Sequence, residues 1–280
     1  MTTVFQASPQ MTSTPTPGNP WPDRFLASSG VLWFLAAAIG QWIFVYYVAA
    51  YYVPFLAKNG VSGLGSTHLP DGFIAGDLAG NIAIATHVVI AIVIIGGGPL
   101  QLIPPLRKHF PAFHRMVGRT YMSAAVITSI AGLYMVWTRG VPGGPLAPYA
   151  ISLDAVLIFI FAAIAVRFAI MRKIDQHRRW AMRLFMVVSA VWFFRIGMMF
   201  WFMATGGVGI DTETFTGPFI TFIYFGQMFV PLLVLEIYFR AQDSNSAGLK
   251  LSATLLVFLA TGVTAIGTFA ATMGMWFPRL

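Results

Sequence analysis

Long apolar stretches alternate with short polar connections along most of the chain. A helix rises about 1.5 Å per residue, so about 20 apolar residues cross the hydrocarbon core of a bilayer. The apolar runs are continuous and do not alternate with a period of two, which favours helices over the strands of a membrane barrel. The pattern therefore predicts seven membrane-spanning helices, at Gly30 to Leu56, Gly80 to Ile103, Gly118 to Thr138, Leu146 to Met171, Trp180 to Thr205, Gly217 to Phe239 and Leu251 to Phe277.

The composition agrees with this architecture. Hydrophobic residues make up 58% of the chain and charged residues only 9%, a balance that a water-soluble domain cannot cover with polar surface. We therefore expect an all-α, polytopic membrane helical bundle formed by residues 26–280. Residues 1–25 are rich in Thr, Pro and Ser and predict a disordered cytoplasmic tail. The chain has no cysteine, which excludes disulfides, thiolate metal sites and thiol nucleophiles.

The basic residues fall mostly on one side of the predicted helices. With the N-terminus in the cytoplasm, all but four of the 17 Lys and Arg residues lie on the cytoplasmic side; the exceptions are Lys58, Arg139, Arg195 and Arg279. Positively charged flanks are retained in the cytoplasm, so the pattern predicts a cytoplasmic N-terminus and an external C-terminus in a bacterial inner membrane. The net charge of +8 then reflects topology and contact with anionic lipid, and we expect no nucleic-acid partner.

Ionisable side chains within the predicted spans are the first candidates for a functional site, because an unpaired charge in hydrocarbon costs about 2.5 kcal/mol or more. His87, Asp154 and Arg195 each lie roughly 10–15 Å from the outer end of their helices, and Gln227 lies at a similar level. In a functional interpretation, Arg195 binds an anionic or carbonyl group, Asp154 balances its charge, and His87 handles a proton or coordinates a metal or haem. In a structural interpretation, Asp154 and Arg195 form an ion pair that fixes helix packing.

Two connections at the predicted inner face share a His-Arg pattern. RKHFPAFHRMVGRTY and MRKIDQHRRWAMRLF each place a second arginine one helical turn after the His-Arg pair. Converging arginines bind phosphate or carboxylate through forked hydrogen bonds, and histidines exchange protons near neutral pH. Glu236 is expected to neutralise Arg119 or Arg183. The alternative is that these residues are positive-inside anchors at the lipid head groups. The predicted inner layer comprises His114, Arg115, Arg119, Tyr121, His177, Arg178, Arg179, Arg183 and Glu236.

Three local signals add detail. The run Gly96 to Gly98 predicts a place where a neighbouring side chain or ligand approaches the helix backbone. The long outer connection from Lys58 to Asp77 is expected to fold over the outer mouth of the bundle. Tyr51 and Tyr52, near the end of the first predicted helix, are typical of interface anchors.

Taken together, the quoted segments resemble a known family. THVVIAIVIIGGGPLQLIPPLRKHFPAFHRMVGRTY, the later QHRRWAMRLF, the arginine in VWFFRIGMMFW and the glutamate in VPLLVLEIYFR are similar to a widespread group of bacterial multi-pass membrane proteins classed as a domain of unknown function. The resemblance covers about residues 80–240 and implies a helical membrane fold, but it supplies no reaction. The group's usual Trp-Met-x-Arg is spaced differently here, as Trp180-Ala181-Met182-Arg183. The matching positions are His87, His114, Arg115, Gly118, Arg119, Tyr121, His177, Arg178 and Arg183.

Three functions remain open at this point. The first is binding or transport of a hydrophobic molecule with an anionic or carbonyl head group, such as a lipid or quinone. The second is a membrane oxidoreductase using quinol or b-type haem, by distant analogy with membrane b-type cytochromes, with His87, His114 and His177 as candidate ligands or proton donors. The third is a non-catalytic subunit or assembly partner of a membrane protein complex, in which the polar layers only specify packing.

Overall fold

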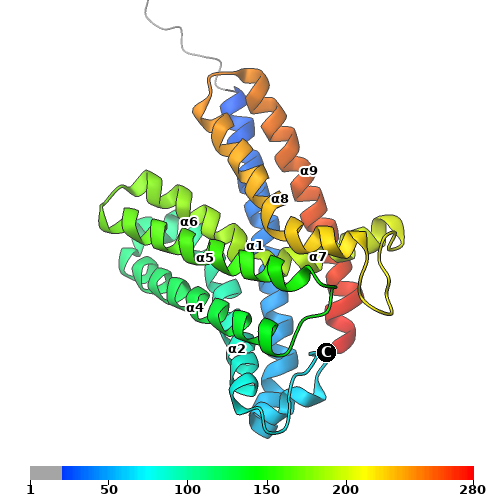
Figure 1. Cartoon of the computed structure of the whole chain (residues 1–280). Coiled ribbons are helices and arrows are strands. Elements are labelled where there is room, and N and C mark those ends of the chain that lie inside the picture. Colours follow the sequence, from blue (N-terminus) through cyan, green and yellow to red (C-terminus); the bar gives the residue numbers. More distant parts are fainter. Residues whose placement is uncertain (1–20) are drawn as a thin grey trace, which may run out of the picture.

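A computed structural model describes residues 21–280 of the protein (Figure 1). Residues 1–20 of the predicted tail lie outside the described residues, and residues 21–25 already belong to the first helix. Pro22 and Asp23 favour this helix start, because Pro fits the first turn and a carboxylate complements the helix dipole. The described elements are α1 (Trp21–Asn59), η1 (Gly60–Ser66), α2 (Leu78–Leu102), α3 (Pro104–His109), α4 (Pro111–Thr138), α5 (Ala147–Ile170), α6 (Ile174–Val188), α7 (Ala190–Thr205), α8 (Pro218–Asp243), α9 (Ala247–Ala271), η2 (Thr272–Trp276) and η3 (Phe277–Arg279).

The described residues form an all-helical bundle, which confirms the predicted fold class. Six helical segments are long and apolar enough to cross a membrane, and α6 with α7 makes a seventh if the bent pair is counted as one span. These segments coincide with the seven apolar stretches of the sequence. The placement of the two ends relative to the cytoplasm stays a prediction. We call the end of the molecule where α1 begins the inner end and the end where α1 finishes the outer end.

The fifth predicted helix is broken. α6 and α7 meet at an angle of 55° around Ser189, whose hydroxyl accepts a hydrogen bond of 2.9 Å from Nε2 of the buried Gln41 on α1. A polar side chain inserted at a serine is a recognised cause of helix kinks. The apolar run across Trp180 to Thr205 contains no proline, so hydropathy alone predicts one continuous helix there.

Two groups of helices meet along α1 and α7. Figure 1 shows α1, α8 and α9 running together toward the inner end, while α2, α4, α5 and α6 lean away from them. Small residues allow the closest approaches: a Cβ atom at Gly267 of α9 would lie 2.4 Å from the carbonyl oxygen of Ile196 on α7. Gly98 of α2 similarly accommodates the rings of Tyr121 and Phe185, which confirms the predicted approach to the glycine run.

Candidate functional site

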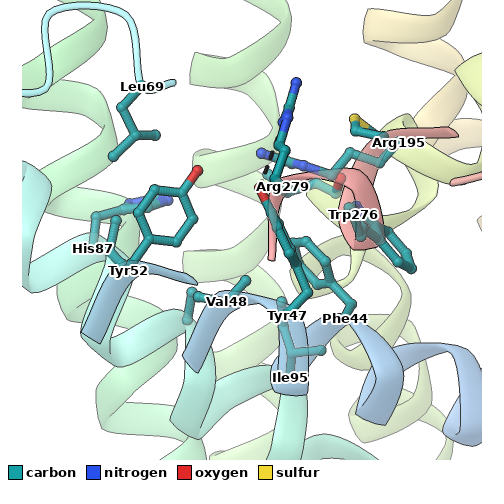
Figure 2. A pocket seen from close by; sticks show the side chains of 14 residues that line it. Phe44, Tyr47, Val48, Tyr52, Leu69, His87, Ile95, Arg195, Trp276 and Arg279 are labelled. Atoms are coloured by element: carbon teal, nitrogen blue, oxygen red, sulfur yellow. Dashed lines mark hydrogen bonds between the residues drawn. The ribbon is translucent and has the colours of Figure 1, made fainter. Parts of the chain in front are cut away.

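A small cavity of about 100 Å³ lies at the outer end, enclosed by α1, α2, α7 and the C-terminal segment 272–279 (Figure 2). His87 from α2 and Arg195 from α7 both line it, so two of the predicted outer-layer residues come together. Figure 2 shows His87 beside Tyr52 on one side, with Arg195, Arg279 and Trp276 on the other. We call this space the outer cavity; it is lined by Phe44, Tyr47, Val48, Tyr52, Leu69, His87, Val88, Ala91, Ile95, Val191, Arg195, Met275, Trp276 and Arg279.

Neither guanidinium group of the outer cavity faces a carboxylate. Arg195 donates to the carbonyl of Val191, one turn earlier in α7, at 3.1 Å, and its guanidinium carbon lies 5.3 Å from the ring centre of Phe44. Arg279 donates to the hydroxyl of Tyr47 at 3.5 Å. Among residues 21–280, no ion pair involves either arginine. Each guanidinium is therefore met by a single neutral acceptor, and that of Arg195 also by the ring of Phe44.

Two lining residues also carry buried polar atoms with no hydrogen-bond partner among the described residues: Nδ1 of His87 and Nε1 of Trp276. An unpaired buried polar group costs about 1–3 kcal/mol, so such groups are uncommon and mark places where a water molecule or ligand supplies the missing bond. The outer cavity is thus polar as well as aromatic.

The other two residues of the predicted outer layer lie elsewhere. Oδ1 of Asp154 on α5 is buried without a hydrogen-bond partner, and Asp154 forms no ion pair with Arg195 within the described part of the chain. The expected pair is therefore corrected: α5 does not bring its carboxylate to the outer cavity, because α5 packs on α4 and α6. Gln227 is buried on α8 and donates to the Tyr224 carbonyl at 2.9 Å.

The outer connection contributes to the cavity, as expected from its length, through Leu69. The interpretation of Tyr51 and Tyr52 as interface anchors was wrong, because they are only 9% and 8% exposed. Tyr52 lines the outer cavity, and the ring of Tyr51 stacks on His68 at 5.9 Å with an interplanar angle of 2°. The outer connection covers these rings and removes them from the lipid boundary.

Arg139 ties this connection to the bundle, a role that the sequence did not reveal. Its guanidinium binds Asp77 through two bonds of 2.9 and 2.8 Å, the Asp71 carbonyl at 2.7 Å and the Asn81 side chain at 2.7 Å. The Gly80 N–H, followed by Arg139, holds the pKa of Asp77 below its ordinary value. The one signal in the sequence was that Arg139 and Asp77, which caps α2, both lie on the predicted outer side of the membrane.

At the inner end, two arginines of α6 bind two carboxylates of α8. Arg183 donates to Glu236 at 2.5 and 2.9 Å, which confirms one of the two partners predicted for that glutamate. Arg179 donates to Asp243 at 2.7 and 2.5 Å. Both guanidinium carbons lie near the ring of Phe239, at 4.9 Å for Arg179 and 5.3 Å for Arg183. These forked pairs fasten α6 to α8.

The remaining inner-layer residues do not join that arrangement. Arg115 and Arg119 are exposed, without an ion pair in residues 21–280, and Tyr121 is buried in the core. Nδ1 of His177 contacts the Ala165 carbonyl at 2.9 Å, whereas Nδ1 of His114 is buried without a partner. No group of three or more His, Cys, Asp or Glu side chains suited to a metal ion occurs among the described residues. Haem ligation by His87, His114 or His177 stays a prediction.

A second, much larger space of about 890 Å³ lies between α1, the α6–α7 pair, α8 and α9. Aromatic and aliphatic side chains make up most of its walls, and Gln227 lies among them. Arg107 and Arg178 line its inner end together with the paired Arg179. We call this space the inner groove and define it by Trp33, Phe193, Phe222, Val230 and Val263 on its walls and by Arg107, Arg178 and Arg179 at its inner end.

Comparison with known proteins agrees with the resemblance noted from the sequence. Residues 84–238, more than half of the chain, match the model of one family, and this match runs from α2 to α8. No curated protein and no solved structure matches the chain. The match does not test the His and Arg motifs or the analogy with cytochromes. The chain belongs to the family described as "Predicted membrane protein (DUF2306)", a family of membrane proteins without an assigned function.

Proposed function

We propose that this membrane protein binds an anionic lipid in the inner groove, with the head group at Arg107 and Arg178 and the acyl chain along the apolar walls. The observation that carries the proposal is that one continuous space combines an apolar surface with a basic one. Its walls are apolar over most of their length, and its inner end holds arginines from α3 and α6. Amphipathic ligands are recognised by this division, because each part of the molecule meets groups of matching polarity.

The charges at the inner end favour an anion. Arg179 also lines the groove, but its charge is already balanced by Asp243. Arg107 and Arg178 form no ion pair among residues 21–280, and the one acidic residue in the lining is Asp175. Two guanidinium groups at one mouth can hold a phosphate through forked hydrogen bonds. A net positive mouth at the end of an apolar groove therefore suits a phospholipid.

The size and opening of the groove suit an acyl chain. About 890 Å³ lies within the range of roughly 300–1,000 Å³ that is usual for small-molecule pockets. Val31 and Phe222 line the groove while remaining 59% and 56% exposed, so the groove opens sideways, where lipid surrounds the bundle. A lipid can therefore enter from the membrane without passing through water. This geometry is compatible with storage, presentation or movement of the bound molecule.

The test compares the lipids that co-purify with the wild-type protein and with two double variants. Mass spectrometry of protein extracted in mild detergent is expected to show anionic phospholipid enriched over the bulk membrane. Arg107→Gln with Arg178→Gln removes the head-group site and is expected to abolish the enrichment. Arg115→Gln with Arg119→Gln is the matched control, because it removes the same charge from exposed arginines outside the groove.

A second pair of variants tests the apolar part separately. Ala260→Phe places a ring in the groove and is expected to reduce lipid occupancy, whereas Leu255→Phe adds apolar surface on the exposed side of α9 and is expected to leave it unchanged. Lipid composition identical to the bulk membrane in all variants contradicts the proposal. Enrichment of a neutral quinone would keep the groove as a binding site but would overturn the assignment of an anionic head group.

A further inference from the structure

We propose that the outer cavity is a second and independent binding site, which takes a small carboxylate. It lies at the opposite end of α1 from the arginines of the inner groove and shares no lining residue with that groove. The proposal goes beyond lipid binding and depends on different residues. Four features of the outer cavity support it: the charge of the lining, the unused hydrogen-bond donors, the size of the space and the access to it.

The lining carries positive charge without a counterion. Arg195 and Arg279 both face the cavity, His87 adds an imidazole, and no Asp or Glu is among the lining residues. Two guanidinium groups in one small space repel each other, so an anion between them relieves an unfavourable interaction as well as forming new bonds. This arrangement selects against cations and favours a negatively charged ligand.

Most donors of the two arginines are unused. A guanidinium has five N–H groups in a fixed fork, and here Arg195 makes one hydrogen bond, to Val191, while Arg279 makes one, to Tyr47. The fork matches the two oxygens of a carboxylate. Nε1 of the lining residue Trp276 also lacks a partner among the described residues and is left for a ligand or water to satisfy, whereas Nδ1 of His87 lies beside Gly132 of α4.

The volume limits the ligand to a compact molecule. About 100 Å³ is less than the roughly 150 Å³ of an engineered protein cavity that holds benzene, so a carboxylate with two or three carbons fits and an aromatic acid does not. The walls beside the arginines are aromatic, from Phe44, Tyr47 and Trp276 (Figure 2). These flat apolar surfaces suit the short hydrocarbon part of such an acid.

Access is from the outer side, through the C-terminal segment. Arg279 is exposed to solvent while its guanidinium reaches the cavity, and Leu69 of the outer connection lies across from it. His87 and Arg195 are set further in, on α2 and α7. An anion can therefore meet Arg279 first and pass inward to Arg195, which attracts it by the same charge.

The experiment titrates small acids into the full chain, reconstituted in nanodiscs of neutral phosphatidylcholine so that no anionic lipid competes. Isothermal titration is expected to give saturable binding of acetate and propionate. Acetamide and propionamide, which have the same shape without the charge, are expected to bind at least about tenfold more weakly. Benzoate is expected not to bind, because it exceeds the cavity.

Variants locate the site. Arg279→Gln lies on an exposed residue and is expected to keep the fold and weaken propionate binding by about tenfold or more. Arg195→Gln is expected to weaken it similarly, and Arg195→Lys, which keeps the charge but not the fork, by less. Arg240→Gln, at the other end of the molecule, is the control and should change nothing. Absence of saturable binding, equal affinity for acid and amide, or full affinity in Arg279→Gln and Arg195→Lys overturns the proposal, and none of these results bears on the inner groove.

Discussion

The outer cavity and the inner groove both present arginines without acidic partners, yet they differ in almost every other respect. The outer cavity is small and aromatic and is reached past the exposed Arg279, with its two arginines contributed by α7 and the C-terminal segment. The inner groove is large, aliphatic and aromatic, open to the side, and adjacent to forked ion pairs between α6 and α8. Only the second has the volume and the apolar walls that the proposed lipid requires.

The contrast shows that the position of each arginine relative to carboxylates matters more than the number of arginines. Asp77, Asp243 and Glu236 bind the arginines that hold the structure together. The arginines that line cavities without such a partner are the ones available to a ligand. The first class is Arg139, Arg179 and Arg183, and the second is Arg107, Arg178, Arg195 and Arg279.

The largest effect is expected at α7, which lines both the outer cavity and the inner groove. Gly267 of α9 lies against the Ile196 carbonyl of α7, and a Cβ atom there would be 2.4 Å from that oxygen. Because a backbone carbonyl cannot turn aside, Gly267→Ala should push α7 outward and lower the free energy of unfolding by about 3 kcal/mol. Both proposed binding activities should fall together, since Arg195 lines one space and Ile196 the other.

Thermal unfolding in detergent measures this change, and Gly262→Ala is the control on the same helix. A Cβ atom at Gly262 would meet nothing within 4 Å, so that substitution should stabilise the helix by about 0.5–1 kcal/mol. Equal stability of the two variants would show that α7 and α9 do not approach each other closely at Gly267.

The next largest effect on the free energy of unfolding distinguishes arginines that are paired with a carboxylate from those that line a cavity without one. Arg183→Gln breaks the forked pair with Glu236, whose side chains are only 17% and 37% exposed, and should lower the free energy of unfolding by about 2 kcal/mol after allowance for solvent. Arg179→Gln breaks a pair that is 36% and 60% exposed and should cost less than about 1 kcal/mol. Arg195→Gln should cost least, because it leaves no carboxylate behind. A double-mutant cycle with Glu236→Gln checks the coupling, and an equal cost at all three arginines would remove the distinction.

Asp154 should respond in the opposite direction. Its Oδ1 atom is buried without a hydrogen-bond partner among the described residues, and burying a carboxyl costs free energy whether it keeps its charge or takes up a proton, so the isosteric Asp154→Asn should raise the free energy of unfolding by about 1 kcal/mol. Asp175→Asn, on the exposed first turn of α6, should stay within about 0.5 kcal/mol of the wild type. A clear loss of stability in Asp154→Asn would restore the idea that this carboxylate is paired.

The sequence predicted those features that depend on neighbouring residues. Continuous apolar runs placed the membrane helices, because backbone hydrogen bonds must be satisfied within each span. Arg179 and Arg183, four residues apart on one face, both reached α8, and Gly98 admitted its neighbours as expected. Local spacing on a helix places these groups on one face and so can be read from one segment, but it does not determine which helix supplies the partner.

Features built from distant segments could not be derived in this way. Depth along a helix placed Asp154 and Arg195 at one level, but level does not determine which way a side chain faces, and that depends on how the helices pack. The partners of His87 and Arg195 come from α1 and from Trp276 and Arg279 near the C-terminus. Tyr52, interpreted as an anchor at the lipid boundary, lines the cavity because the outer connection covers it.

The smallest expected effect is a pH response confined to the outer connection. The pKa of Asp77 is lowered by the Gly80 N–H and by Arg139, so the carboxylate stabilises the connection fully above its ordinary pKa of about 3.9 and loses that contribution as the pH falls through the lower folded pKa. Hydrogen exchange across residues 60–77, corrected for the intrinsic rate at each pH, should therefore report local opening below about pH 4. The inner ends of α6 and α8 serve as the internal reference. Arg139→Gln should open the same residues already at neutral pH, because it removes the bonds to Asp77, Asn81 and the Asp71 carbonyl together. Unchanged protection in that variant would mean that packing of the connection against Tyr51 and Tyr52, and not the arginine, holds the connection on the bundle.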